Sequence, residues 1–220
     1  MYESNASQDL TAAWSDSSQI IEFIPGMRDD VSPFSNLRPA YTSRFLSCAT
    51  SVLLEEFEER LQEVAKYFPE IEGEIKIGLT NSYRGLAVVM SRGKSISRKL
   101  SFPPLTKRGL PSRYVIGHEL MHLSHALKKG FPGTERATDV FTLARLPPKL
   151  LDAPPVYLRM PESIRRHWSR GEFQTVFSTL AHDLALDAIL SRNENCRYIA
   201  RWEAMFAKKA QESISLSWPL

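Results

Sequence analysis

The segment His118-Glu119-Leu120-Met121-His122 constrains this chain more than any other, because it spaces two histidines four residues apart. The surrounding apolar residues continue a helical pattern, with Ser112 placed to cap the start of the helix and Gly130 to end it. Residues four apart lie on one face of a helix, so the two imidazoles converge on one point with Glu119 beside them. This arrangement suits two zinc ligands and a general base next to the metal-bound water.

A second helix is predicted from Glu135 to Arg145, after a turn-forming stretch at 131–134, with Thr134 as its N-cap. Glu135 and Asp139 are four residues apart and therefore share one face of this helix. A catalytic zinc site needs a third protein ligand, and a histidine ligand usually donates its other N–H to a carboxylate. Glu135 and Asp139 are candidates for these two roles.

Together these residues resemble the gluzincins, the thermolysin-like zinc metallopeptidases, over about residues 114–145. In that family a glutamate on a following helix completes the site, and an aspartate four residues later commonly orients the first histidine. The resemblance implies that zinc is bound by His118, His122 and Glu135. It also implies that Glu119 is the catalytic residue and that Asp139 orients His118. The link between His122 and Glu135, twelve residues long, is shorter than is usual in the family.

Other ligand sets stay open at this point. His125 lies on the same helix face as His118, as an alternative ligand or as a residue behind the ligands. Asp139 as the ligand, supported by Glu135, would resemble the aspartate-ligand zincins instead. The metzincin pattern is excluded, because position 125 is His rather than Gly and position 128 is Lys rather than His.

The composition is that of an ordinary globular chain. At 220 residues, with 43% hydrophobic and 24% charged residues, one domain with small appendages is expected. Cys48 and Cys196 form no metal or disulfide motif. No signal peptide pattern and no apolar run of transmembrane length is present, so a cytoplasmic location without membrane contact is the expectation.

A basic stretch precedes the histidine motif. The net charge is only +3, but seven cations follow one another without an acidic residue: Arg92, Lys94, Arg98, Lys99, Lys107, Arg108 and Arg113. Such a stretch could bind nucleic acid or an acidic substrate, or it could be the solvated face of edge strands. No zinc-ribbon, RNA-binding or helix-turn-helix signature accompanies it.

A zincin-like catalytic core is predicted over residues 41–146. Apolar residues at helical spacing predict one long helix over 42–68, ended by Pro69. Alternating or short apolar runs predict three strands, at 74–79, 85–90 and 95–102. The fold class is therefore α+β, a small and mostly antiparallel sheet with packed helices. By the resemblance, the last strand before the motif would be the edge to which an extended peptide adds.

The two ends of the chain carry weaker patterns. Residues 1–40 are expected to form a partly flexible N-terminal arm, with a short apolar piece at 20–25. Residues 147–220 begin with a proline-rich link and end in two helices, roughly 172–192 and 195–213, that form a helical cap on the core. Tyr157 in the link is either an oxyanion stabiliser, as tyrosines are in such peptidases, or a packing residue.

These patterns favour a zinc-dependent metallopeptidase that hydrolyses peptide bonds in a peptide or protein substrate. The main alternative is a non-catalytic zinc-binding or protein-interaction module of zincin fold. A third hypothesis, a DNA-associated protease, depends only on the basic stretch.

Overall fold

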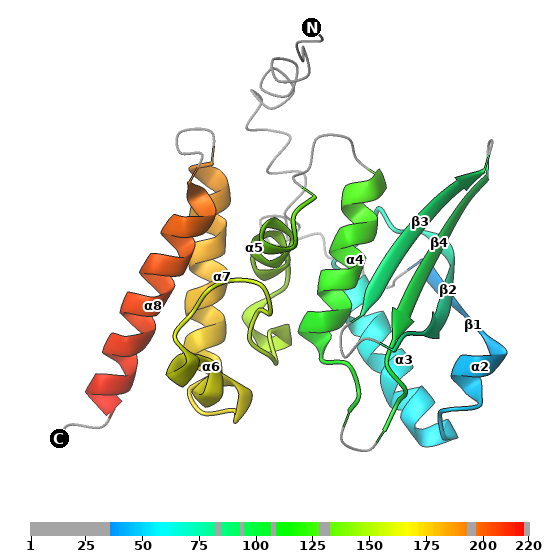
Figure 1. Ribbon diagram of the computed structural model, residues 1–220, viewed down its shortest axis with the longest axis horizontal. Coiled ribbons are helices and arrows are strands. Elements are labelled where there is room, and N and C mark those ends of the chain that lie inside the picture. Colours follow the sequence, from blue (N-terminus) through cyan, green and yellow to red (C-terminus); the bar gives the residue numbers. More distant parts are fainter. Residues whose placement is uncertain are drawn as a thin grey trace, which may run out of the picture.

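A computed structural model of the chain describes residues 36–81, 85–92, 95–106, 109–127, 133–192 and 197–217. The predicted arm, including the apolar piece at 20–25, lies almost wholly outside these residues. The fold is α+β, as predicted: a small sheet stands at one side, and the helices α4, α5, α7 and α8 follow it in succession (Figure 1). One continuous hydrophobic core runs through the sheet and the helices.

The sheet has four described strands in the order β1-β2-β4-β3. Their bounds are β1 Leu37–Tyr41, β2 Gly73–Leu79, β3 Leu86–Arg92 and β4 Ser95–Phe102. β1 pairs with β2 and β2 with β4 in parallel, and only β3 and β4 are antiparallel. The prediction of a mostly antiparallel sheet was therefore wrong. Alternation of apolar residues marks a strand but does not encode the direction of its neighbour, which depends on the chain connection.

The edge of the sheet next to the histidine motif is β3, not the last strand before the motif. A short hairpin pairs Arg92 with Ser95, so β4 folds back beside β3 and takes the interior position against β2. The expectation that the last strand forms the edge is corrected accordingly. β3 packs against α4 (Figure 1).

The first helical region is divided, although one long helix was predicted over 42–68. It forms α2, Ser43–Leu46, and α3, Ser51–Ala65. No strand was predicted at β1, which lies almost wholly within the stretch that was assigned to the N-terminal arm. Thr42 and Thr50 each cap one of these helices, since their Oγ1 atoms accept the N–H of Phe45 and Leu53, at 3.3 and 3.4 Å. The apolar period continues across the break, so periodicity alone could not find it.

The motif helix, α4, spans Arg113–Leu127 and is capped from two sides. The Ser112 hydroxyl accepts the N–H of Val115 at 3.2 Å, as predicted. The carboxylate of Asp152, from the proline-rich link, accepts the N–H groups of Arg113 and Tyr114, each at 3.1 Å. The link therefore satisfies N–H groups that a helix start leaves without partners in the helix itself.

The second motif helix, α5, spans Glu135–Arg145, and the Thr134 hydroxyl caps it through the N–H of Ala137 at 3.3 Å. A buried ion pair joins the end of α5 to the segment after α3: Nη2 of Arg145 lies 2.6 Å from Oε2 of Glu70. The Arg145 guanidinium also lies over the ring of Phe68, 4.4 Å from its centroid. These contacts hold the end of α5 against the segment that follows α3.

The C-terminal part packs on α5 rather than on the sheet. It contains a 3-10 turn Pro148–Leu150 and the helices α6 Glu162–Ser169, α7 Gln174–Leu190 and α8 Tyr198–Ser217. The two long helices were predicted; α6, only eight residues long, was not. α7 packs between α5 and α8, and the rings of Trp202 and Phe206 stack 4.8 Å apart within this layer. None of the described helices combines the length and apolarity needed to cross a membrane.

Candidate metal centre

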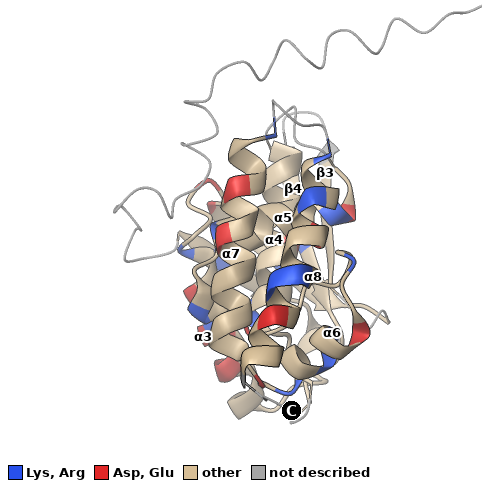
Figure 2. Ribbon diagram, turned by 90° about the vertical axis from the view of Figure 1, so that its left-hand side faces the viewer, with Lys and Arg blue, Asp and Glu red and all other residues tan. Residues whose placement is uncertain are grey.

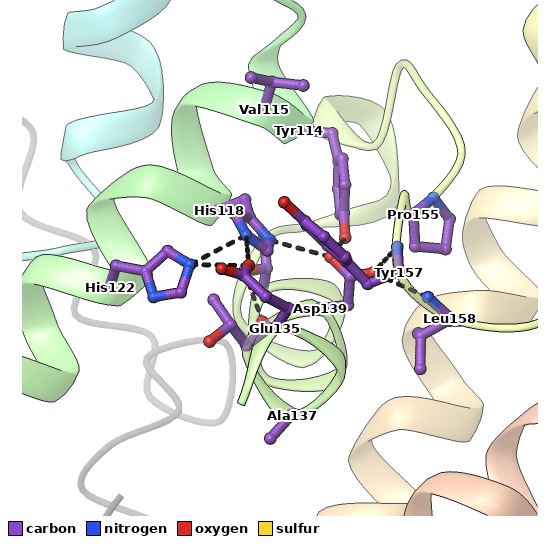
Figure 3. A network of polar contacts seen from close by, with 12 residues as sticks. Tyr114, Val115, His118, His122, Glu135, Ala137, Asp139, Pro155, Tyr157 and Leu158 are labelled. Carbon is purple, nitrogen blue, oxygen red and sulfur yellow. Dashed lines mark hydrogen bonds and ion pairs between the residues drawn. The ribbon is translucent and has the colours of Figure 1, made fainter. Parts of the chain in front are cut away.

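Helices α4 and α5 bring three ligand atoms to one point (Figure 3). Oε2 of Glu135 lies 3.0 Å from Nε2 of His118 and 3.1 Å from Nε2 of His122. The two Nε2 atoms are themselves 3.1 Å apart. His118 is buried, His122 is half-buried and Glu135 is exposed, so the group extends from the interior to the surface.

This three-atom group fits a tetrahedral metal ion. Bonds of about 2.0–2.2 Å in tetrahedral geometry place neighbouring ligand atoms about 3.3–3.6 Å apart, so a bound ion would require the three atoms to move apart by only a few tenths of an ångström. Neutral imidazole carries one ring proton, so if Nδ1 holds it in both histidines, three lone pairs point at each other. A cation at the centre would satisfy all three at once. The donor set of two imidazoles and one carboxylate is also one that zinc accepts.

Asp139 lies behind His118 and not in the three-atom group. Its Oδ1 atom is 2.8 Å from Nδ1 of His118 and accepts the hydroxyl of Tyr114 at 2.6 Å. Its Oδ2 atom accepts the backbone N–H groups of Tyr157 and Leu158, at 2.7 and 3.0 Å. A carboxylate at Nδ1 keeps the proton on that nitrogen, which leaves the Nε2 lone pair facing the group. The geometry thus favours Glu135 as the ligand over Asp139.

The residues of the three-atom group shift one another's pKa values. Burial lowers the pKa of His118, but Asp139 and Glu135 outweigh burial and raise it to about 9. The hydrogen bond with His118 is the largest influence on Glu135, whose pKa falls to about 2 although partial burial opposes the shift. Burial and the neighbouring His118 lower the pKa of His122. The carboxylates therefore favour a positive charge at this point, which a proton or a metal ion can supply.

Glu119 lies between the metal ligands and the edge strand. Glu119 is only 5% exposed, and the backbone N–H of Ala87 on β3 donates to its carboxylate. Burial is the main cause that raises the pKa of Glu119 to about 7; His118 opposes the shift and Glu135 adds to it. A carboxylate that titrates near neutral pH is suited to exchange protons with a reacting group.

His125 is placed outside the three-atom group. Its ring packs edge-on against Phe141, with the centroids 5.5 Å apart. Burial, followed by the positive neighbours His122 and Arg145, lowers the pKa of His125 to about 3. Its position favours a packing role behind the ligands over direct metal binding.

His125 is expected to make the metal-free protein less stable below pH 6.5. The folded pKa of about 3 lies below the ordinary value of 6.5, so the unfolded chain binds the proton first as the pH falls. The effect of His125 on the free energy of unfolding is therefore absent above pH 6.5. It grows as the pH falls toward 3 and lowers the free energy of unfolding by about 2 kcal/mol at about pH 5. Urea unfolding with a chelator present should show this loss in the natural protein and a smaller loss in His125→Gln. An equal loss in both proteins would contradict the assignment.

Tyr157 lies at the site through its ring and its backbone. The ring stacks on His118, with the centroids 5.5 Å apart and the planes inclined by 21° (Figure 3). A role for Tyr157 in stabilising an oxyanion stays a prediction.

Sequence reasoning missed Tyr114 and Leu158 as partners of Asp139. Tyr114 precedes His118 by four residues and could have been found from the helix face that the two share.

The structure describes only part of the basic stretch. Lys94, Lys107 and Arg108 lie outside the described residues. Arg113 is 2.6 Å from Glu63 and 3.6 Å from Asp152, so acidic neighbours compensate its charge. On the opposite side of the molecule, basic and acidic residues are interspersed over the face of α7 and α8 (Figure 2).

The chain was compared with protein-family models, with curated proteins and with solved structures, and no match was found. What the protein does is therefore inferred from the geometry of its site. That geometry consists of three converging ligand atoms, a buried carboxylate behind the first histidine, and a second buried carboxylate beside the group.

Proposed function

We propose that the protein is a zinc-dependent peptidase. The observation that carries the proposal is the convergence of His118, His122 and Glu135 at separations of 3.0–3.1 Å, with Asp139 on the far nitrogen of His118. Glu119 follows His118 directly and is buried beside the same group. Each residue type at each position matches a requirement of metal-assisted hydrolysis.

The residues divide the chemistry among them. His118, His122 and Glu135 would hold zinc, which when bound lowers the pKa of a coordinated water and polarises a carbonyl group. Glu119 accepts the proton of the attacking water and passes it to the leaving amine. Asp139 keeps the ring of His118 in its orientation and tautomer. The peptide substrate would lie along the exposed side of the group, at Glu135.

The number of ligands favours a catalytic over a structural site. Structural zinc sites are closed by four protein ligands, whereas catalytic sites have three and keep one position open. Among the residues that the structure describes, three ligand atoms gather at this point and His125 is directed against Phe141 instead. This favours an enzyme over a non-catalytic zinc-binding module.

The proposal is tested by metal content and metal removal. The purified protein is expected to hold about one zinc per chain and to cleave members of a peptide library, read out by mass spectrometry. A chelator should lower the rate at least about 10²-fold, and added zinc should restore it, because the attacking water then regains its activation.

A matched pair of histidine variants serves as the control. His122→Ala should lose the metal and the activity, because a ligand is missing. His182→Ala removes a histidine of α7 that contacts the Leu143 carbonyl at 2.9 Å, and it should keep both. Peptide cleavage that persists without metal, or a metal held by four protein ligands, would rule out the proposed function.

A further inference from the structure

Gly85, the residue just before the edge strand β3, faces the carboxylate of Glu119. A Cβ atom at position 85 would lie 2.4 Å from Cγ of Glu119 and 2.6 Å from both Cδ and Oε1. Carbon atoms of neighbouring residues do not approach so closely, so Glu119 can occupy its position only because residue 85 has no side chain. The backbone of Gly85 is not left-handed, unlike that of Gly73 and Gly171. The glycine is therefore needed for space and not for backbone conformation.

A second contact holds the same carboxylate from the same segment. The N–H of Ala87, two residues further along, donates to Glu119. Glu119 is 5% exposed, so its carboxylate is enclosed between α4 and the start of β3 and has little room to turn. The contacts of β3 with α4 keep the two segments together. The backbone from Gly85 to Ala87 thus forms a slot that fits one carboxylate.

We propose that Gly85 is a positioning residue that sets where the Glu119 carboxylate stands relative to the metal ligands. The proposal rests on the peptidase function proposed above. A methyl group at position 85 would force the end of the Glu119 side chain away from β3 while leaving all three metal ligands in place. A displacement of about 1 Å at a reacting group can lower a rate about 10²-fold.

The main test is Gly85→Ala. We expect kcat to fall about 10²-fold, with KM and zinc content unchanged, because neither the ligands nor the exposed side of the site is altered. The matched control is Gly133→Ala, another glycine near the site, where a Cβ would meet nothing within 4 Å. This control should keep kcat within about twofold.

A background without the carboxylate shows whether Gly85 acts through Glu119. In Glu119→Ala protein, adding Gly85→Ala should change the residual kcat by less than about twofold, because no carboxylate is left to displace. A Gly85→Ala variant with full kcat, with lost zinc, or with the same 10²-fold loss in the Glu119→Ala background would overturn the proposal.

A readout that needs no activity separates this proposal from the proposed function. The larger Gly85→Val change should lower the melting temperature of the natural protein by about 3 °C or more, and that of Glu119→Ala protein by clearly less, because the shorter alanine side chain leaves the slot empty. If the effect of Gly85→Val on the melting temperature depends on Glu119 in this way but the natural protein cleaves no peptide, the peptidase function is wrong. The close fit of Glu119 against Gly85 would then still be supported. If peptides are cleaved but this dependence and the kcat loss are both missing, the positioning role is wrong.

Discussion

Replacing Glu119 by glutamine is expected to lower kcat by about 10²–10⁴-fold, the range that general acid–base catalysis contributes, while zinc stays bound. Glutamine has nearly the shape of glutamate, so it fits the slot beside Gly85 and disturbs none of the three ligands. It cannot accept the proton of water at neutral pH, and this is the step that the variant removes. Rates on a cleaved peptide and zinc per chain are measured on the same preparations.

The stability of this variant separates lost chemistry from lost structure. Burial raises the pKa of Glu119 from 4.5 to about 7, so in the metal-free protein this group lowers stability as the pH rises through that interval. Glutamine has no such charge, and Glu119→Gln should therefore unfold at the same or a higher urea concentration above pH 7. The matched control is Glu59→Gln, at an exposed glutamate of α3, which should keep full activity. A Glu119→Gln variant that kept the kcat of the natural protein would contradict the proposed mechanism.

Replacing Asp139 by alanine should produce the largest loss of stability among the site residues. The carboxylate is fully buried and faces the Tyr114 hydroxyl, Nδ1 of His118 and the backbone N–H groups of Tyr157 and Leu158. Its removal leaves several buried donors without an acceptor, at a cost of about 3–5 kcal/mol in the free energy of unfolding. Zinc affinity should also fall about 10–100-fold, because the ring of His118 is no longer oriented.

Urea unfolding and competitive zinc titration measure the two losses independently. Asp139→Asn keeps the shape but turns an N–H group toward the surrounding donors, so it too should be destabilised and bind zinc more weakly. Asp183→Ala, at an exposed position on α7, is the control and should leave both quantities within error. If Asp139→Ala kept the zinc affinity of the natural protein, Asp139 would have no part in orienting His118.

The effect of Asp139 extends into the C-terminal part of the chain. Its Oδ2 atom holds the proline-rich link at Tyr157 and Leu158, while Asp152 of the same link caps α4. Asp152 therefore holds the start of α4 directly, and Tyr157 and Leu158 hold the carboxylate that contacts His118. The segment after residue 146 is part of the framework of the site and not only a cover on it.

Several parts of the site were predictable because they depend on local geometry. Four-residue spacing places His118 with His122, and Glu135 with Asp139, on shared helix faces whatever the rest of the fold does. The caps Ser112 and Thr134 act on N–H groups three residues away, and the strands at 74–79 and 95–102 follow from alternation alone. Relations within one or two turns of chain can be read directly from residue order.

Other features were decided by contacts between distant segments. The break between α2 and α3 leaves the apolar period intact, and strand direction follows from where each connection returns, so neither could be read from the local pattern. Asp152 reaches the start of α4 from 38 residues away, and Gly85 meets Glu119 across the junction of sheet and helix. Such pairings exist only once the core has brought the segments together.

Residue order by itself determined which chemistry this chain can carry: two imidazoles on one helix, two carboxylates on the next, and a glutamate beside the first histidine. The tertiary structure alone decided how those groups meet. Packing of α4 against α5 sets the 3.0–3.1 Å separations, and it places Asp139 behind His118. The start of β3 encloses Glu119. The physical reason is that helix periodicity acts within a few residues, whereas the distance between two helices depends on every side chain packed between them.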